Sequence, residues 1–168
     1  MFDESIVFSK IECRQQINDD IVLYIGKVHV DYIYEYLIIS DKDFYEPLST
    51  RVDLKSFAEK LHRLSTTFVI VYKQETAGLI ASYFYDQSSR KGFITLVHLK
   101  DKFRGKHLSD YLVEAVQTYA ESINFEFVDL AVYRDNISAF NLYNKHDFKV
   151  LSEENGRGLM RGKSKQKK

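Results

Sequence analysis

The sequence is poor in residues that cross-link or interrupt a chain. It has one cysteine, Cys13, and one proline, Pro47, among 168 residues. A single cysteine cannot close an internal disulfide, and no His or second Cys lies near it at the spacing of a metal site, so we interpret it as structural and predict no metal cofactor. No Pro-rich linker or internal repeat divides the chain. We therefore expect one domain over residues 1–154.

Long apolar runs are also missing. No window reaches the ~18 uninterrupted apolar residues that a membrane helix requires. The first ten residues, MFDESIVFSK, hold acidic side chains where a secretory signal would have basic ones. Apolar residues make up 45% of the chain, which is ordinary for a globular protein. These features predict a cytoplasmic protein with no membrane partner.

The net charge of zero hides an asymmetry along the chain. Residues 155–168 carry six basic and no acidic side chains, which leaves 18 basic and 24 acidic residues elsewhere. A basic segment can bind nucleic acid, but this one lacks interleaved aromatic residues and apolar periodicity. We therefore expect a disordered, solubilising tail over 155–168 and no nucleic-acid partner.

Apolar periodicity predicts ten elements in a mixed order. The expected strands lie near 5–12, 67–73, 79–86, 92–99, 125–133 and 147–153, and the expected helices at 28–40, 53–64, 108–122 and 135–146. Asp53 is a suitable N-cap for the second helix. The helix 108–122 repeats its apolar residues every three or four positions, so one face should be buried. This order predicts a mixed α/β (α+β) domain with a strand–loop–helix unit in its middle.

That middle unit, VHLKDKFRGKHLSDYL, runs from an apolar strand through a basic loop into a helix. The unpaired N–H groups and the positive dipole end of the helix would point into the loop and form an anion site. Lys100, Lys102, Arg104 and Lys106 add positive charge there. The phosphate of a nucleotide or coenzyme is the natural ligand, and a merely solvated basic loop is the alternative. The glycine spacing matches neither a Walker sequence nor a dinucleotide fingerprint.

The loop resembles the acetyl-CoA-binding motif of the GNAT superfamily of N-acetyltransferases, Gln/Arg-x-x-Gly-x-Gly/Ala. Arg104 matches the first position, whereas His107 and Ser109 stand where glycine or a similarly small residue is usual. A second stretch, VDLAVYRDNISAFNLYNKHDF, is similar to the superfamily's later motif, with Asp147 in place of Gly. Its matching residues are Leu130, Val132, Asn136, Ala139, Leu142, Tyr143, Lys145 and Phe148. The resemblance covers residues 68–150 and implies the GNAT fold, a mixed central sheet flanked by helices.

The resemblance also implies direct transfer of acetyl from acetyl-CoA to a primary amine. The residues that it assigns to the coenzyme are Val97, His98, Leu99, Arg104, Gly105, Lys106, His107, Leu108, Ser109, Asn136 and Tyr143. The strand residues would pair with the pantetheine arm, and the loop N–H groups, with Arg104 and Lys106, would hold the pyrophosphate. Asn136 could equally be only a helix N-cap. Tyr143 would protonate the departing thiolate, unless it is simply a core aromatic.

The general base is less well defined. A primary amine with a pKa of ~10.4 is neutral less than about 0.1% of the time at pH 7, so a proton must be removed. His98 titrates in a suitable range and lies near the expected thioester, although it could be a buried, hydrogen-bonded histidine. Asp129 and Tyr133 are reserve candidates. Tyr83 and Tyr85 could line the acceptor groove or simply pack in their strand.

The acceptor is expected to be a small-molecule amine. An amino sugar nucleotide is the first candidate, because residues 44–54 are similar to GNAT members among surface-polysaccharide enzymes, and a protein amine is the second. A catalytically inactive acyl-CoA-binding or interaction module is the alternative, since His107, Ser109 and Asp147 replace usual glycines. GNAT proteins are often dimers, so a homodimer stays open.

Overall fold

A single mixed sheet organises the computed structural model, which describes residues 1–167. Its strand order is β1-β2-β3-β4-β5-β6-β8-β7, and every neighbouring pair is antiparallel except β5 and β6. The strands are β1 (Phe8–Gln16), β2 (Ile21–Val28), β3 (Ser65–Tyr72), β4 (Glu75–Tyr83), β5 (Lys91–Leu99), β6 (Phe127–Tyr133), β7 (Lys149–Glu154) and β8 (Arg157–Lys163). The predicted mixed α/β fold is confirmed.

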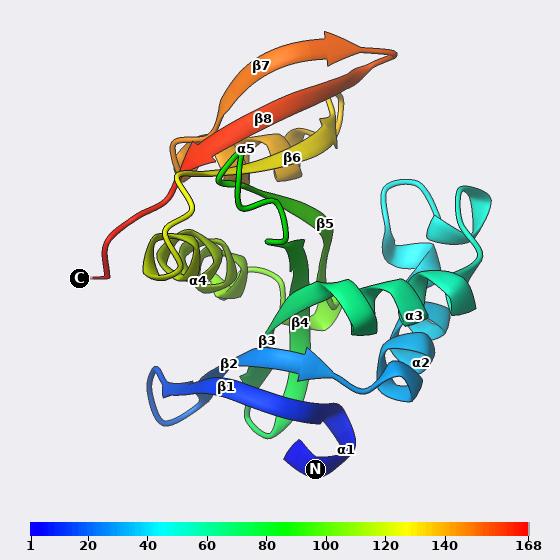
Figure 1. The fold of residues 1–168 in the computed structure, drawn as a ribbon. Helices are drawn as coiled ribbons and strands as arrows, with labels where there is room; N and C mark the ends of the chain where they lie inside the picture. The colour runs from blue at the N-terminus through cyan, green and yellow to red at the C-terminus, as the bar shows by residue number, and fades with distance from the viewer. Residues whose placement is uncertain (168) are drawn as a thin grey trace.

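Helices cover both faces of the sheet (Figure 1). They are α1 (Glu4–Val7), α2 (Val30–Ser40), α3 (Leu54–Leu64), α4 (Leu108–Ser122) and α5 (Ile137–Lys145), with 3-10 turns η1 (Asp41–Asp43), η2 (Leu48–Thr50) and η3 (Asp101–Phe103). Strand alternation divides the core in two: Leu23 and Ile70 pack with α4, while Tyr24 and Val69 pack with α2 and α3. The central strands are thus buried on both sides.

The helix signals in the sequence are reproduced locally. Asp53 caps α3 by accepting a hydrogen bond from the backbone N–H of Ser56 at 3.0 Å. In α4, Leu108, Leu112 and Val116 are buried on one face, as their spacing predicted. The long predicted elements from 53 to 146 are therefore in place.

The N-terminal prediction is wrong in part. Residues 4–7 form the single-turn helix α1, and the first strand begins only at Phe8. The strand β2 was missed altogether. Its sequence IVLYIGKV is apolar at nearly every position because both faces are covered, so it lacks the alternation that marks a half-buried strand.

The expected C-terminal tail is also wrong over residues 157–163. These residues form β8, which lies between β6 and β7. Its basic side chains alternate with the buried residues Gly158, Met160 and Gly162, a period of two that the charge count concealed. Arg161 also pairs with Asp129 on the neighbouring strand β6 at 2.7 Å. Residue 168 lies outside the described residues.

Because β8 is part of the sheet, shortening a buried side chain in this strand should destabilise the fold. Met160 is fully buried, so Met160→Ala should lower the free energy of unfolding by roughly 2–5 kcal/mol because it leaves a cavity. Urea denaturation measures the loss, with exposed Lys163→Ala on the same strand as the control. Equal stability of the two variants would contradict a structured C-terminal strand.

Candidate active site

The site is made by two neighbouring strands that separate. Strands β5 and β6 pair in parallel from Lys91↔Phe127 to Ile94↔Leu130, where the register ends. Beyond that point β5 continues to pair with β4 on its other edge as far as Leu99. At a rise of ~3.3 Å per residue, residues 95–99 offer about 16 Å of edge without a strand partner on the β6 side. Backbone N–H and C=O groups on this edge are available to an extended ligand.

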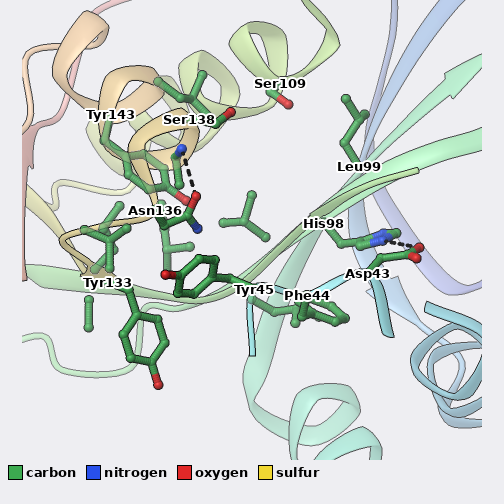
Figure 2. A pocket seen from close by; sticks show the side chains of 18 of the residues that line it. Asp43, Phe44, Tyr45, His98, Leu99, Ser109, Tyr133, Asn136, Ser138 and Tyr143 are labelled. Atoms are coloured by element: carbon green, nitrogen blue, oxygen red, sulfur yellow. Dashed lines mark hydrogen bonds and ion pairs between the residues drawn. The ribbon is translucent and has the colours of Figure 1, made fainter. Parts of the chain in front are cut away.

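A cavity of about 820 Å³ opens where the strands separate. Its walls come from β5, β6, the loop before α4, the first turns of α5, and the segment that joins α2 to α3 (Figure 2). We call this last segment, residues 41–52, the strap. One cavity therefore connects the predicted coenzyme loop with the strap, which contains most of residues 44–54, the stretch whose resemblance suggested an amino sugar acceptor.

The loop before α4 is open toward the cavity. Gly105 has φ +82° and His107 has φ +61°, so both lie in the left-handed region that favours glycine. The His107 side chain contributes to the cavity lining but is 78% exposed, and its Nδ1 lies 3.4 Å from the Asp110 carboxylate. Ser109 lines the cavity at the start of α4 (Figure 2). The helix N-terminus thus keeps the geometry of an anion site despite the missing glycine.

Only one of the four basic side chains in this segment lines the cavity. This side chain is Arg104, which lines the cavity and is exposed. Lys100 and Lys102 pair with Glu75 at 3.7 and 2.6 Å, and Lys106 lies over a tyrosine ring outside the lining. The predicted side-chain contact of Lys106 with a pyrophosphate is therefore not supported, whereas that of Arg104 is geometrically feasible.

The unit formed by β6 and α5 brings Tyr143 and Asn136 to the cavity. Tyr143 is 5% exposed, and burial raises the pKa of its phenol, so the hydroxyl keeps its proton at neutral pH. Asn136 caps α5 by accepting a hydrogen bond from the backbone N–H of Ala139 at 3.4 Å (Figure 2). The capping role considered from the sequence is present, and the side chain lines the cavity as well.

His98 lies on the β5 wall in a fully formed hydrogen-bond network. Its Nδ1 lies 2.6 Å from the Tyr36 hydroxyl, and its Nε2 lies 3.2 Å from Oδ2 of Asp43 in the strap (Figure 2). The Phe44 ring packs against the imidazole with 5.1 Å between centroids. Burial lowers the pKa of His98, and the nearby Asp43 carboxylate only partly opposes this effect. The imidazole is therefore neutral at pH 7.

The strap also reaches across to β6 and β8. Tyr45 packs against Tyr133 with 5.3 Å between ring centroids, and the Tyr133 hydroxyl donates a hydrogen bond to Glu46. This hydrogen bond raises the pKa of Tyr133, which makes that residue a poor base. The guanidinium of Arg157 lies 5.1 Å from the centroid of the Tyr133 ring. The resemblance at residues 44–54 assigns no role to any side chain, and the predicted tail includes Arg157, so the sequence does not predict this group.

Three other sequence candidates lie elsewhere. Asp129 is held by Arg161 through two hydrogen bonds of 2.7 and 2.9 Å and does not line the cavity. Tyr83 is buried in the α2–α3 core, and Tyr85 is exposed beside it. Asp129 therefore does not reach the cavity, and of the two interpretations of Tyr83 and Tyr85 the structure favours packing in the strand over lining the acceptor groove.

Within residues 1–167, no helix is long and apolar enough to cross a membrane. The same residues contain no group of three or more His, Cys, Asp or Glu side chains placed to hold a metal ion.

Comparisons with solved structures identify the same fold in acetyltransferases. The chain is similar to the ribosomal-protein-S18-alanine N-acetyltransferase from Escherichia coli, with a TM-score of 0.69 and 13% identity over 87% of this chain and 96% of that one. It is similar to the PaiA N-acetyltransferase from Thermoplasma acidophilum in complex with coenzyme A, with a TM-score of 0.67 and 16% identity over 84% and 98%. It is also similar to a chimera of the spermidine N-acetyltransferase SpeG from Vibrio cholerae and hSSAT, with a TM-score of 0.67 and 15% identity over 84% of this chain and 95% of that one. At these identities the likeness shows the fold alone.

Sequence comparison supplies the family. No curated protein sequence matches the chain. The model of the acetyltransferase (GNAT) family matches residues 30–148, a span that contains β5, the loop before α4, and the β6–α5 unit. This match extends over well more than half of the chain. The protein therefore belongs to the acetyltransferase (GNAT) family and is an acetyl-CoA-dependent acyltransferase.

Proposed function

We propose that the protein transfers acetyl from acetyl-CoA directly to the primary amine of a small molecule that also carries an anionic group, with an amino sugar nucleotide as the first candidate. The observation that carries the proposal is the continuity of one cavity. Its lining includes the strand edge of β5 and the N-terminus of α4, which we call the first side, and the aromatic and arginine side chains of the strap, β6 and β8, which we call the second side.

The residues on the first side fit the coenzyme. The free edge of β5 at Val97–Leu99 can pair with an extended amide-containing arm, and the N–H groups from Arg104 to Ser109 can hold a pyrophosphate. When bound, acetyl-CoA supplies a thioester whose carbonyl carbon accepts the amine and whose sulfur leaves. A backbone N–H on β5 aimed at the carbonyl oxygen would contribute about 3 kcal/mol to catalysis.

The proposed role of Tyr143 is to protonate the leaving sulfur. Its phenol is buried, protonated and part of the cavity lining. The burial that raises the pKa of the phenol also raises that of a thiol held beside it, so the two groups stay close enough in proton affinity for transfer. We therefore assign Tyr143 as the general acid.

The second side of the cavity favours an acceptor with an anionic group. Nε of Arg157 is buried and has no hydrogen-bond partner within residues 1–167, and neither Arg157 nor Arg51 forms an ion pair there. Glu46 is already engaged by the hydroxyls of Tyr133 and Thr50. The two guanidinium groups share this lining with the carboxylates of Asp43 and Glu46, and the pKa of Glu46 is lowered by the hydrogen bond from Tyr133 and, less strongly, by their charge. Because Nε of Arg157 still has no partner, we favour an acceptor with a phosphate or carboxylate over a polyamine such as the spermidine named for one structural neighbour. The Tyr45 and Tyr133 rings offer a stacking surface for a sugar.

The alternative of an inactive binding module rested on the missing glycines. His107 and Ser109 both line the cavity, but the His107 side chain is 78% exposed, and Asp147 lies outside the lining with an exposed side chain. The cavity still has a volume of about 820 Å³ with these side chains in place, which supports the enzyme over the module.

Replacement of the proposed acid should abolish turnover and leave coenzyme binding intact. Tyr143→Phe keeps the ring that packs on Phe148 but removes the hydroxyl, so kcat should fall by about 10²–10⁴-fold. Thiol release from acetyl-CoA across an amine panel measures the loss, with exposed Tyr85→Phe as the matched control. Undiminished release by Tyr143→Phe with a good acceptor would contradict the assignment.

The acceptor side predicts a selective change in KM. Arg157→Met keeps the aliphatic stem on Tyr133 but removes the charge, so KM for a phosphate-bearing amine should rise roughly tenfold or more, while KM for a neutral amine changes little. Steady-state kinetics with both amines measure the difference, and Arg134→Met, which removes an arginine paired with Glu153 outside the cavity, is the control. Equal effects on both amines would contradict an anion site at Arg157.

A further inference from the structure

The network around His98 fixes which of its nitrogens carries the proton. The partner of Nε2 is the carboxylate of Asp43, which can only accept a hydrogen bond, so Nε2 must be the donor. A neutral imidazole then has its lone pair on Nδ1, and the Tyr36 hydroxyl, 2.6 Å away, donates to it. Both ring nitrogens are thus occupied within the protein, and no lone pair of His98 is free to receive a proton from a substrate.

The surrounding charges keep this arrangement. His98 is 4% exposed, and burial lowers its pKa, with further repulsion from Lys100 on β5 and Arg104 in the next loop. Burial raises the pKa of the Tyr36 hydroxyl on α2, so that group remains a donor at any working pH. Within residues 1–167, Asp43 is the one acidic group in contact with the His98 ring, and the uncharged ring of Phe44 packs against the imidazole. The imidazole is therefore a neutral bridge between two fixed partners.

Asp43 has the accessibility that His98 lacks. Its side chain is 36% exposed and lines the cavity, and only one of its oxygens, Oδ2, is used by His98. Within residues 1–167, Oδ1 makes no side-chain hydrogen bond and no ion pair. The carboxylate can therefore accept a proton from the cavity and release it to solvent.

We propose that Asp43, and not His98, takes the proton of the attacking amine, and that His98 and Tyr36 are positioning residues that hold the carboxylate. This inference rests on the proposed function. The amine nitrogen bonds the acetyl carbon, the carbon–sulfur bond breaks, and the sulfur takes the proton of Tyr143. One N–H bond of the amine breaks, and its proton passes to Asp43, directly or through water. Tyr143 regains a proton from solvent, and Asp43 returns its own to solvent.

A carboxylate is a weak base, but it does not have to deprotonate a free ammonium ion. The amine enters the reaction in its neutral form, and its nitrogen becomes far more acidic as it bonds the carbonyl carbon. A positioned group contributes about 10²–10⁴-fold to such a proton transfer when its pKa suits that step. The hydrogen bond from His98 fixes the orientation of the Asp43 carboxylate, and a fixed orientation toward the reacting atom is what an efficient proton transfer requires.

The variants His98→Gln and Asp43→Asn separate the two roles. A glutamine amide can donate to Asp43 from a position close to that of Nε2 but cannot carry a titrating proton, so His98→Gln should keep kcat within about tenfold of wild type, whereas Asp43→Asn should lose about 10²-fold or more. Asp31→Asn on α2 removes the same charge outside the cavity and is the control. If His98→Gln is as inactive as Asp43→Asn while both bind acetyl-CoA, the proposal is overturned.

The pH dependence gives a second readout. If Asp43 takes the proton, the acidic limb of the kcat profile should have the same apparent pKa in wild type and His98→Gln. Loss of that limb in His98→Gln would assign the proton to the imidazole instead.

A measurement on the free protein tests the network without turnover. Nitrogen NMR of the histidine ring should show the Nε2–H tautomer of His98, neutral at pH 7 and protonated only below its ordinary pKa of 6.5. An Nδ1–H tautomer, or a pKa above 6.5, would overturn the proposal. If no amine supports thiol release by the wild type, the proposed function fails, and the NMR result still decides the arrangement of the three residues.

Discussion

The site depends on one interruption of backbone pairing, the end of the β5–β6 ladder after Ile94 and Leu130. While the strands are paired, both edges of β5 are used by neighbours and no ligand can join the sheet. Once β6 turns away, β5 remains fixed by β4 on one edge and presents the other to the cavity. The same divergence leaves room beside β5 for the cavity that Asn136 and Tyr143 line, while the end of α5 stays attached to the first turn of α4 through His146 and Asp110 at 2.7 Å. Sheet topology thus sets the separation between the loop before α4 and Tyr143, the proposed general acid.

Strand β8 holds β6 in place beside the cavity, and the strap forms part of the cavity wall. β6 is held at its outer edge by β8 over the full length from Phe127↔Lys163 to Tyr133↔Arg157. Asp41 fixes the strap internally by accepting the backbone N–H of Ser49 at 2.9 Å. The strap then contacts β5 through Asp43 and β6 through Tyr45 and Glu46. The proposed acceptor contacts and the proposed proton uptake therefore both involve one short segment that joins two helices.

Much of the fold and half of the site could be predicted because they rest on local signals. The period of α4, the cap of α3 and the two motifs each follow from neighbouring residues. The strand β2 and the buried face of β8 depend on packing against elements that are distant in the sequence, and a single sequence does not show that packing. Likewise, no local pattern indicates that Asp43 meets His98 across 55 positions or that Arg157 meets Tyr133. The departures at His107 and Asp147 fall on positions with positive φ, where glycine is preferred because of backbone strain. Their exposed side chains explain why the site tolerates the change.

The most direct test of the account is the thermal stability of the protein with and without excess acetyl-CoA, for the wild type and Arg104→Ala, with NAD and ATP as control ligands. A ligand at 100 times its Kd should add about 2.7 kcal/mol, which raises Tm by several degrees in a domain of this size. The account predicts a rise with acetyl-CoA alone in the wild type and a smaller rise in Arg104→Ala, because Arg104 is the basic side chain of the loop that lines the cavity. No change in Tm at millimolar acetyl-CoA would contradict it, since the free edge of β5 and the α4 N-terminus would then bind no coenzyme.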